Sequence, residues 1–201
     1  AMHPGARGYD SAAKDLIIPY ELLAFEEVHA AWLDLIPQQS SDILDIGAGT
    51  GRDAAYLASR GHRVTAVEPA HALRHAGMKL HADQQINWMA DALPELTGLS
   101  GHAAAFDLIL LVGVWAHLAA GERREAMLHL ARLLRPGGRL LISLRHGPSP
   151  AGRPMYAVPA SDVIADGTAA GLTLIRRKIM ESIQPGNRAL GVSWTMLAFS
   201  G

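Results

Sequence analysis

The stretch Ser41–Arg52, SDILDIGAGTGR, decides the fold of this 201-residue chain. Isoleucine and leucine alternate through Asp42–Ile46 and three glycines follow, which predicts a buried strand over Asp42–Ile46, a tight turn and then a helix over Asp53–Arg60. Glycine tolerates positive φ and has no Cβ, so backbone N–H groups of such a turn can approach a ligand closely. Glu68 ends the next predicted strand, where its carboxylate can accept both hydroxyls of a ribose. This order of strand, turn, helix and acid-tipped strand predicts a nucleotide-like ligand at the turn.

Composition narrows the class of protein. The chain has 18 basic and 19 acidic residues and a formal net charge of −1, so no global field favours nucleic acid or an anionic membrane. It contains no cysteine, which excludes disulfides, thiolate metal sites, iron–sulfur clusters and a cysteine nucleophile. No apolar run reaches the roughly 18 residues of a membrane span, and the first residues lack the apolar core of a signal peptide. We therefore expect a cytoplasmic protein with no nucleic-acid or membrane partner, and interpret Ala1 before Met2 as a cloning scar.

The N-terminal segment, residues 1–37, is predicted to cap the rest of the chain. His3–Asp15 mixes glycine, proline, arginine and serine, a composition typical of chain ends that a ligand orders. Apolar residues recur through Pro19–Ile36 at near-helical spacing, which predicts one amphipathic helix that packs on the sheet or roofs the pocket. Residues 41–201 form the predicted core. No linker or repeat divides the chain, so we expect a single domain over residues 1–201.

Strand and helix patterns alternate through the rest of the core. Further strands are predicted at Arg63–Val67, Ile86–Met89, Phe106–Val112, Arg139–Leu144, Leu172–Ile183 and Val192–Ser200, and helices at Ala70–Ala82, Glu122–Leu134 and Ser161–Gly171. Ser161 is the expected N-cap of the last helix, and the loop His146–Pro159 is long enough to carry function. The connector Gln184–Gly191 is too short for a crossover helix, so the last two strands should form an antiparallel hairpin. Alternating βα units followed by a hairpin predict a doubly wound, mostly parallel α/β sheet.

Several motifs together resemble class I S-adenosylmethionine-dependent methyltransferases. They are Asp45-x-Gly47-x-Gly49-Thr50-Gly51-Arg52, the acid Glu68, Asp91 after the third strand, Phe106-Asp107-Leu108-Ile109 and Leu134-Arg135-Pro136-Gly137-Gly138. Their order and spacing match the family over roughly Ile43–Leu144. An arginine at the position of Arg52 is similar to the pattern of the subgroup that resembles tellurite-resistance methyltransferases. The resemblance implies a Rossmann-like, three-layer α/β fold with a seven-stranded sheet in the order 3-2-1-4-5-7-6, in which strand 7 is antiparallel. It also implies S-adenosylmethionine as the cofactor.

The resemblance assigns the cofactor site residue by residue. Asp45 with Gly47, Ala48, Gly49 and Gly51 would hold the methionyl part, Glu68 and Pro69 the ribose, Asp91 and Ala92 the adenine edge, and Val112 and Gly113 the sulfonium end. Without the resemblance, Asp45 could merely cap the adjacent turn and Glu68 could be a solvated strand end. A dinucleotide site is the nearest competitor, but Arg52 occupies the third small-residue position of that fingerprint, which disfavours it.

Residues that follow the fourth and fifth strands are candidates for catalysis and acceptor binding, because ligands bind beyond the carboxyl ends of parallel strands. Histidine side chains titrate near neutral pH, so His117 and His146 are candidate proton acceptors, although each could serve structure alone. Arg145 could clamp an anionic acceptor or pair with a carboxylate. Trp115 could line the acceptor pocket or join the core, and Tyr9 could close over the cofactor.

The chemistry of the acceptor is narrowed by what the sequence lacks. His71 and His75 have a spacing compatible with one metal face, but no glutamate follows His71, so a solvated helix is favoured and no metal is predicted. The strand Phe106–Val112 is followed by Gly-Val-Trp, not by the Asn/Asp-Pro-Pro-aromatic signature associated with methylation of amino groups on bases and glutamine. The prediction is therefore a methyltransferase for a small O-, N- or S-nucleophile, as a monomer or homodimer. The competing hypothesis is a non-catalytic domain that binds S-adenosylmethionine or S-adenosylhomocysteine as a sensor or partner protein.

Overall fold

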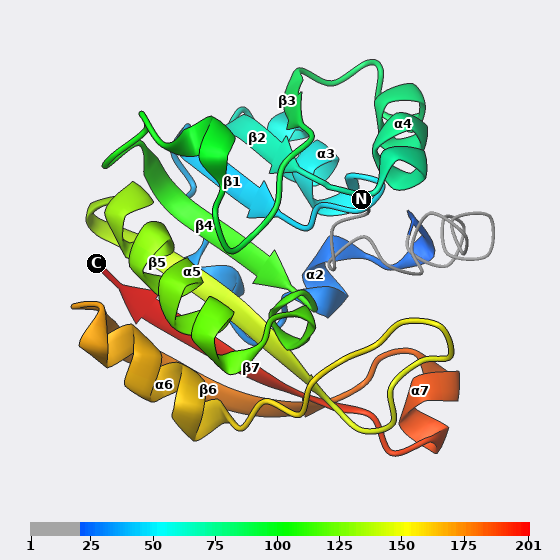
Figure 1. The fold of residues 1–201 in the computed structure, drawn as a ribbon. Helices are drawn as coiled ribbons and strands as arrows, with labels where there is room; N and C mark the ends of the chain where they lie inside the picture. The colour runs from blue at the N-terminus through cyan, green and yellow to red at the C-terminus, as the bar shows by residue number, and fades with distance from the viewer. Residues whose placement is uncertain (1–20) are drawn as a thin grey trace.

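The computed structural model of the protein describes residues 21–201. Its centre is a seven-stranded sheet in the order β3-β2-β1-β4-β5-β7-β6 (Figure 1). The strands are β1 (Asp42–Ile46), β2 (Arg63–Val67), β3 (Ile86–Met89), β4 (Phe106–Val112), β5 (Leu134–His146), β6 (Thr173–Glu181) and β7 (Ser193–Ser200). β7 pairs antiparallel with both of its neighbours, and the other pairs are parallel. The fold class, strand order and closing hairpin predicted from the sequence are confirmed.

The central strand β4 is covered on both faces, which explains its almost wholly apolar sequence. Leu108 and Leu110 enter one core cluster, whereas Ile109 and Leu111 enter the other. All four side chains are fully buried. This alternation follows from the two-residue period of a strand and places the carboxyl end of β4 between the two helical layers.

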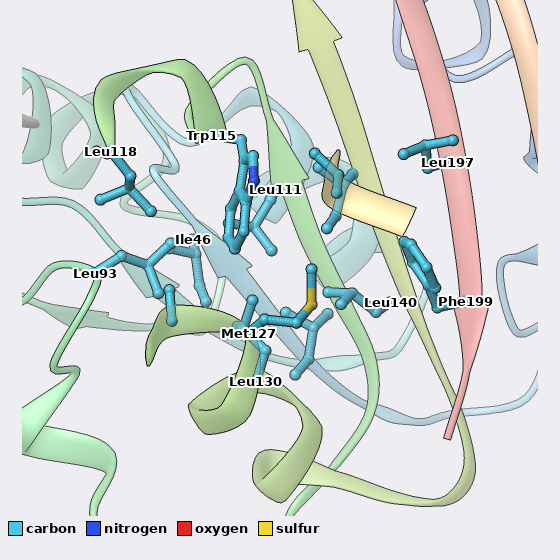
Figure 2. Packing of buried hydrophobic residues seen from close by; sticks show 14 of the residues in the cluster. Ile46, Leu93, Leu111, Trp115, Leu118, Met127, Leu130, Leu140, Leu197 and Phe199 are labelled. Atoms are coloured by element: carbon cyan, nitrogen blue, oxygen red, sulfur yellow. The ribbon is translucent and has the colours of Figure 1, made fainter. Parts of the chain in front are cut away.

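Helices cover both faces of the sheet (Figure 1). Helix α3 (Arg52–Ser59) lies on one face, while α5 (Ala120–Leu133) and α6 (Ala160–Ala169) contribute to the core on the other. In Figure 2, Met127 and Leu130 of α5 point toward the sheet residue Leu140. Helix α4 (His71–Leu80) follows β2. Within residues 21–201, no helix is long and apolar enough to cross a membrane.

The expected helix over Pro19–Ile36 is wrong for its described part. Helix α2 spans only Phe25–Val28, and after a turn a short 3₁₀ helix, η2, spans Leu33–Leu35. The break lets the chain bend around the sheet, so that apolar residues from both pieces join one core cluster. Trp32 and His29 are both fully buried at this bend, and the Trp32 indole N–H donates to His29 Nδ1 at 2.7 Å. Apolar spacing alone did not distinguish this bend from a helix.

Three smaller differences concern the ends of elements. Pro159 is the N-cap residue of α6 and no side chain caps that helix, so the expected cap Ser161 is wrong. Strand β5 begins at Leu134, earlier than the predicted Arg139, because Leu134 already pairs with Phe106 of β4. The β6–β7 connector contains a short helix, α7 (Pro185–Ala189), inside the expected turn.

Candidate functional site

A cavity of about 560 Å³ opens where the parallel strands end. Ten of the predicted cofactor residues line it, namely Asp45, Gly47, Ala48, Gly49, Glu68, Pro69, Asp91, Ala92, Val112 and Gly113. The predicted residues His117 and Arg145 line it as well. Much of the remaining wall comes from residues 148–155, which follow β5, and from residues 180–196, which form the end of the closing hairpin. The fold therefore gathers residues from the ends of five parallel strands and from two distant segments around one hollow.

The turn after β1 has the backbone that its glycines allow. Gly47 has φ of 72°, and a Cβ added there would lie 2.1 Å from Cγ1 of Val114, so no side chain fits. Gly51 differs from the other predicted residues because it does not line the cavity. A Cβ at Gly51 would lie 2.7 Å from the Trp88 ring, so this glycine allows β3 to pack closely against the turn.

Glu68 fastens this turn to the start of α4. Its Oε1 accepts the N–H of Gly49 at 2.7 Å, and its Oε2 accepts the N–H of Ala70 at 2.8 Å. The residue is only 5% exposed but lines the cavity. An ionised carboxylate has about four acceptor positions, more than these two backbone bonds use. Glu68 thus shapes the turn and places a carboxylate in the cavity wall.

Asp45 places a buried carboxylate in the cavity wall. The residue is 3% exposed, and its carboxylate makes no hydrogen bond within the described part of the chain. Burial raises the pKa of Asp45 well above its ordinary range, and the nearby negative charges of Asp53 and Glu68 raise it further, against the attraction of Arg52. A buried carboxyl group is costly unless a partner compensates its charge. This position therefore favours a ligand that brings a positive charge or an N–H donor.

A buried network holds Arg52 beside Asp45. Because the Trp32 indole N–H can only donate, His29 Nδ1 is the acceptor, and the imidazole proton resides on Nε2. His29 Nε2 then donates to Asp53 Oδ2 at 2.8 Å, while Arg52 Nε donates to Asp53 Oδ1 at 2.9 Å. Burial raises the pKa of Asp53, but His29 and Arg52 outweigh it and keep the pKa well below its ordinary range. Both Arg52 and Asp53 line the cavity.

Asp91 shapes the loop after β3. Its Oδ1 accepts the N–H of Ala92 and its Oδ2 accepts the N–H of Gly98, each at 2.8 Å. Both carboxylate oxygens are thus bonded to the backbone of the loop that they border. Asp91 and Ala92 line the cavity next to Leu93, as one edge of the site.

Comparison with known proteins independently supports the methyltransferase prediction made from the sequence. Residues 43–138 match the methyltransferase domain family. An uncharacterized methyltransferase of Mycobacterium tuberculosis is 31% identical over 113 residues, which are 53% of this chain and 40% of that protein. Residues 43–138 therefore form a methyltransferase domain. The chain spans about half the length of the curated relatives it matches, with values between 22% and 60%.

Solved structures show the same methyltransferase fold. The Burkholderia thailandensis 1,6-didemethyltoxoflavin-N1-methyltransferase, with bound 1,6-didemethyltoxoflavin and S-adenosylhomocysteine, has a TM-score of 0.73 and 23% identity over 96% of this chain and 84% of its own. The [4+2]-cyclase SpnF has the same TM-score at 12% identity, over 96% of this chain and 93% of its own. At such identities the likeness shows the fold alone.

His117 is the predicted base that the methyltransferase fold brings to the cavity. It lies in a short 3₁₀ helix, η4 (Trp115–His117), is 8% exposed, and its Nδ1 lies 3.2 Å from the Pro154 carbonyl oxygen. Burial lowers the pKa of His117 below its ordinary value of 6.5, although the Pro154 hydrogen bond acts in the opposite direction. A neutral imidazole can act as a proton acceptor.

We expect His117 to make folding sensitive to acid. The unfolded chain binds a proton at this position near pH 6.5, whereas the folded chain resists it. The contribution is fully present above pH 6.5 and is lost as pH falls through 6.5 toward the folded pKa. Denaturant unfolding at pH 7.5 and 5.5 should show a smaller loss of stability for His117→Gln than for the wild type. His62→Gln is the matched comparison, because burial lowers the pKa of His62 in the same direction. Its loss of stability between the two pH values is measured in the same way. An identical loss in His117→Gln and the wild type would contradict this expectation.

Besides Gly51, two predicted residues on the acceptor side are not brought to the cavity, and one lies outside the described residues. His146 Nε2 lies 2.7 Å from Thr195 Oγ1, and because successive strand residues face opposite ways, Arg145 lines the cavity while His146 does not. Trp115 is fully buried in the core shown in Figure 2 and does not line the cavity. The remaining predicted substrate residue, Tyr9, lies outside residues 21–201.

Sequence reasoning missed several residues of the wall. Arg52 was noted only as a departure from a pattern, and Trp194, Met180 and Met196 of the closing hairpin were not singled out. The available signal was alternation along the last strand, which puts Trp194 and Met196 on one face. Which face that is depends on pairing with β5, which the sequence does not fix. Within the described residues, no group of three or more His, Asp or Glu side chains could hold a metal ion.

Proposed function

We propose that this methyltransferase transfers a methyl group from S-adenosylmethionine to a small-molecule O-, N- or S-nucleophile. The observation that carries the proposal is the single cavity, which joins the predicted cofactor residues to a further space that we name the acceptor chamber. The acceptor chamber is lined by Ser143, Arg145 and the cavity-facing residues of 148–155 and 180–196. A concave site of this size, mostly apolar with a few polar groups, is typical of small-ligand binding.

The amino-acid end of the cofactor is a zwitterion, and the residues present fit it. The buried carboxylate of Asp45 would meet the ammonium group, and the guanidinium of Arg52 would meet the carboxylate. The Asp53 bond fixes Arg52 for that contact. Backbone N–H groups of the turn after β1 supply further donors.

The nucleoside end would lie against the ends of β2 and β3. Glu68 offers its carboxylate to the ribose hydroxyls, with Pro69 beside it. Asp91 and Ala92 border the space for the adenine edge, and Val112 and Gly113 border the sulfonium end. These assignments join the family pattern to the position of each residue on the cavity wall.

When bound, S-adenosylmethionine supplies a methyl group on a positively charged sulfur, so the protein mainly has to hold the nucleophile in line. Proximity and orientation of this kind can lower a barrier by several kcal/mol. Where the nucleophile carries a proton that must leave, His117 accepts it, because burial keeps this imidazole neutral. His117 thus replaces His146 as our proposed base.

Glu68→Ala should weaken binding of S-adenosylhomocysteine by about 1.5–3 kcal/mol, since charge-assisted hydrogen bonds are lost. Titration calorimetry measures the change directly. Glu95→Ala, at an exposed position outside the cavity wall, is the matched control and should bind like the wild type. Equal affinity of Glu68→Ala and the wild type would refute the ribose assignment.

A second candidate function is binding without catalysis, as a sensor or partner protein. The same fold is found in a [4+2]-cyclase, so the fold does not by itself decide the chemistry. A screen with methyl-labelled S-adenosylmethionine and a panel of small phenols, amines and thiols separates the two functions. Methylation of any class supports the enzyme, whereas cofactor binding without turnover across the panel favours the second function.

A further inference from the structure

Three strands build a continuous wall of the acceptor chamber. The register pairs Arg145 of β5 with Trp194 of β7, and Trp194 with Met180 of β6. All three side chains line the cavity. Directly paired residues in an antiparallel sheet hold their Cβ atoms roughly 4.5–5.5 Å apart. Arg145, Trp194 and Met180 therefore form one cross-strand row, which we name the platform row.

The next row extends the same surface. Ser143 pairs with Met196, and both line the cavity two residues along from the platform row. Residues two apart on a strand share a face, so Trp194 has a methionine on its own strand and another on the neighbouring strand. An indole ring between two thioether side chains is a flat, polarisable surface.

The platform row lies beside the turn that borders the proposed sulfonium end. A Cβ added to Gly113 would lie 3.3 Å from Trp194 Cη2 and 3.5 Å from Cζ3, so the indole reaches the end of β4. The Gly113 N–H also donates to Ser143 Oγ at 2.9 Å, which ties β4 to the second row. A molecule lying on Trp194 would thus be next to the place where methyl transfer must occur.

Arg145 adds a positive charge at one end of the row. Its Nη1 donates to the Pro148 carbonyl at 2.6 Å, which anchors the guanidinium at the start of the loop over the chamber. A guanidinium recognises a planar carboxylate through a two-pronged pair of hydrogen bonds and also stacks on aromatic rings. The row therefore offers a flat surface and an anion-binding group at neighbouring positions.

Building on the proposed function, we propose that the methyl acceptor is a planar aromatic or heteroaromatic molecule with an anionic substituent, its ring on Trp194 and its anion at Arg145. Met180 and Met196 flank the ring and adapt to its outline. The flat apolar surface of Trp194 and the positive charge of Arg145 on the neighbouring strand favour such a ligand over a flexible aliphatic or a cationic molecule.

Three size-matched probes test this assignment with S-adenosylhomocysteine bound to the full chain. They are 4-hydroxybenzoate, which is planar and anionic; 4-hydroxybenzamide, which is planar and neutral; and trans-4-hydroxycyclohexanecarboxylate, which is anionic and not planar. Titration calorimetry should show 4-hydroxybenzoate binding at least tenfold more tightly than either of the others. Arg145→Gln should abolish the preference over the amide, and Trp194→Leu the preference over the cyclohexane acid.

The controls separate failure of this assignment from failure of the proposed function. Arg177→Gln, at an exposed position of β6 outside the cavity wall, should keep all three affinities. Each variant is first required to bind S-adenosylhomocysteine like the wild type. If the wild type binds S-adenosylhomocysteine but binds the three probes equally, or binds none, the acceptor assignment is overturned and the proposed function stands. If it does not bind S-adenosylhomocysteine, the proposed function fails.

Discussion

Gly47→Ala is expected to lower the free energy of unfolding by about 2–6 kcal/mol and to abolish binding of S-adenosylhomocysteine. Part of the cost is the left-handed φ of 72°, worth roughly 1–3 kcal/mol for a residue with a Cβ. The rest is overpacking, about 1–3 kcal/mol, because the new Cβ would lie 2.1 Å from Val114 Cγ1. Relief of this clash moves the turn after β1 or the segment after β4, and both line the cavity. Denaturant unfolding and calorimetry measure the two effects.

Gly61→Ala is the matched control for Gly47→Ala. Gly61 has φ of 89°, but nothing lies within 4 Å of a Cβ there and the residue is outside the cavity wall. Gly61→Ala should lose only the part of the unfolding free energy that comes from the left-handed backbone, and it should still bind S-adenosylhomocysteine. The double variant Gly47→Ala with Val114→Ala should regain part of the lost stability. Equal losses at Gly47 and Gly61 would contradict a role for the Val114 contact.

Asp53→Ala is expected to destabilise the fold by about 3–5 kcal/mol, the usual cost of removing one partner of a buried charged pair. It would leave His29 Nε2–H, which is fully buried, without its acceptor and Arg52 without its anchor. Unfolding in denaturant, followed by circular dichroism, gives the size of the loss. Cofactor affinity should fall as well, because Arg52 lines the cavity.

Two comparisons show whether the Asp53 effect comes from its hydrogen bonds. Asp53→Asn keeps one acceptor oxygen and should lose less stability than Asp53→Ala. Asp83→Ala removes an exposed carboxylate and should remain within about 0.5 kcal/mol of the wild type. A loss below 1 kcal/mol in Asp53→Ala would mean that the His29–Asp53–Arg52 network does not hold this face together.

Local pattern predicted most of the fold because the strands have unambiguous signals. The predicted bounds Asp42–Ile46 and Phe106–Val112 coincide with β1 and β4, where runs of branched residues end at glycine or before a turn. The prediction of one helix over Pro19–Ile36 failed because helical spacing of apolar residues also suits a bent segment that wraps around a core. The side-chain bond between Trp32 and His29 that accompanies the bend has no signature in the sequence.

The cofactor side of the site was more predictable than the acceptor side. Asp45 lies near the end of β1 and Glu68 directly follows β2, so topology alone brings them together. The acceptor side depends on pairing between distant strands. His146 and Arg145 are neighbours in sequence, yet only Arg145 faces the cavity, and Trp194 reaches it through its register with β5.

Titration calorimetry of the wild-type chain with S-adenosylhomocysteine tests most directly whether the cavity is a cofactor site. We expect saturable binding of one molecule per chain, and competition by S-adenosylmethionine. Absence of binding by both compounds up to millimolar concentration would contradict the assignment of Asp45, Arg52 and Glu68 to the cofactor, and with it the proposed methyl transfer.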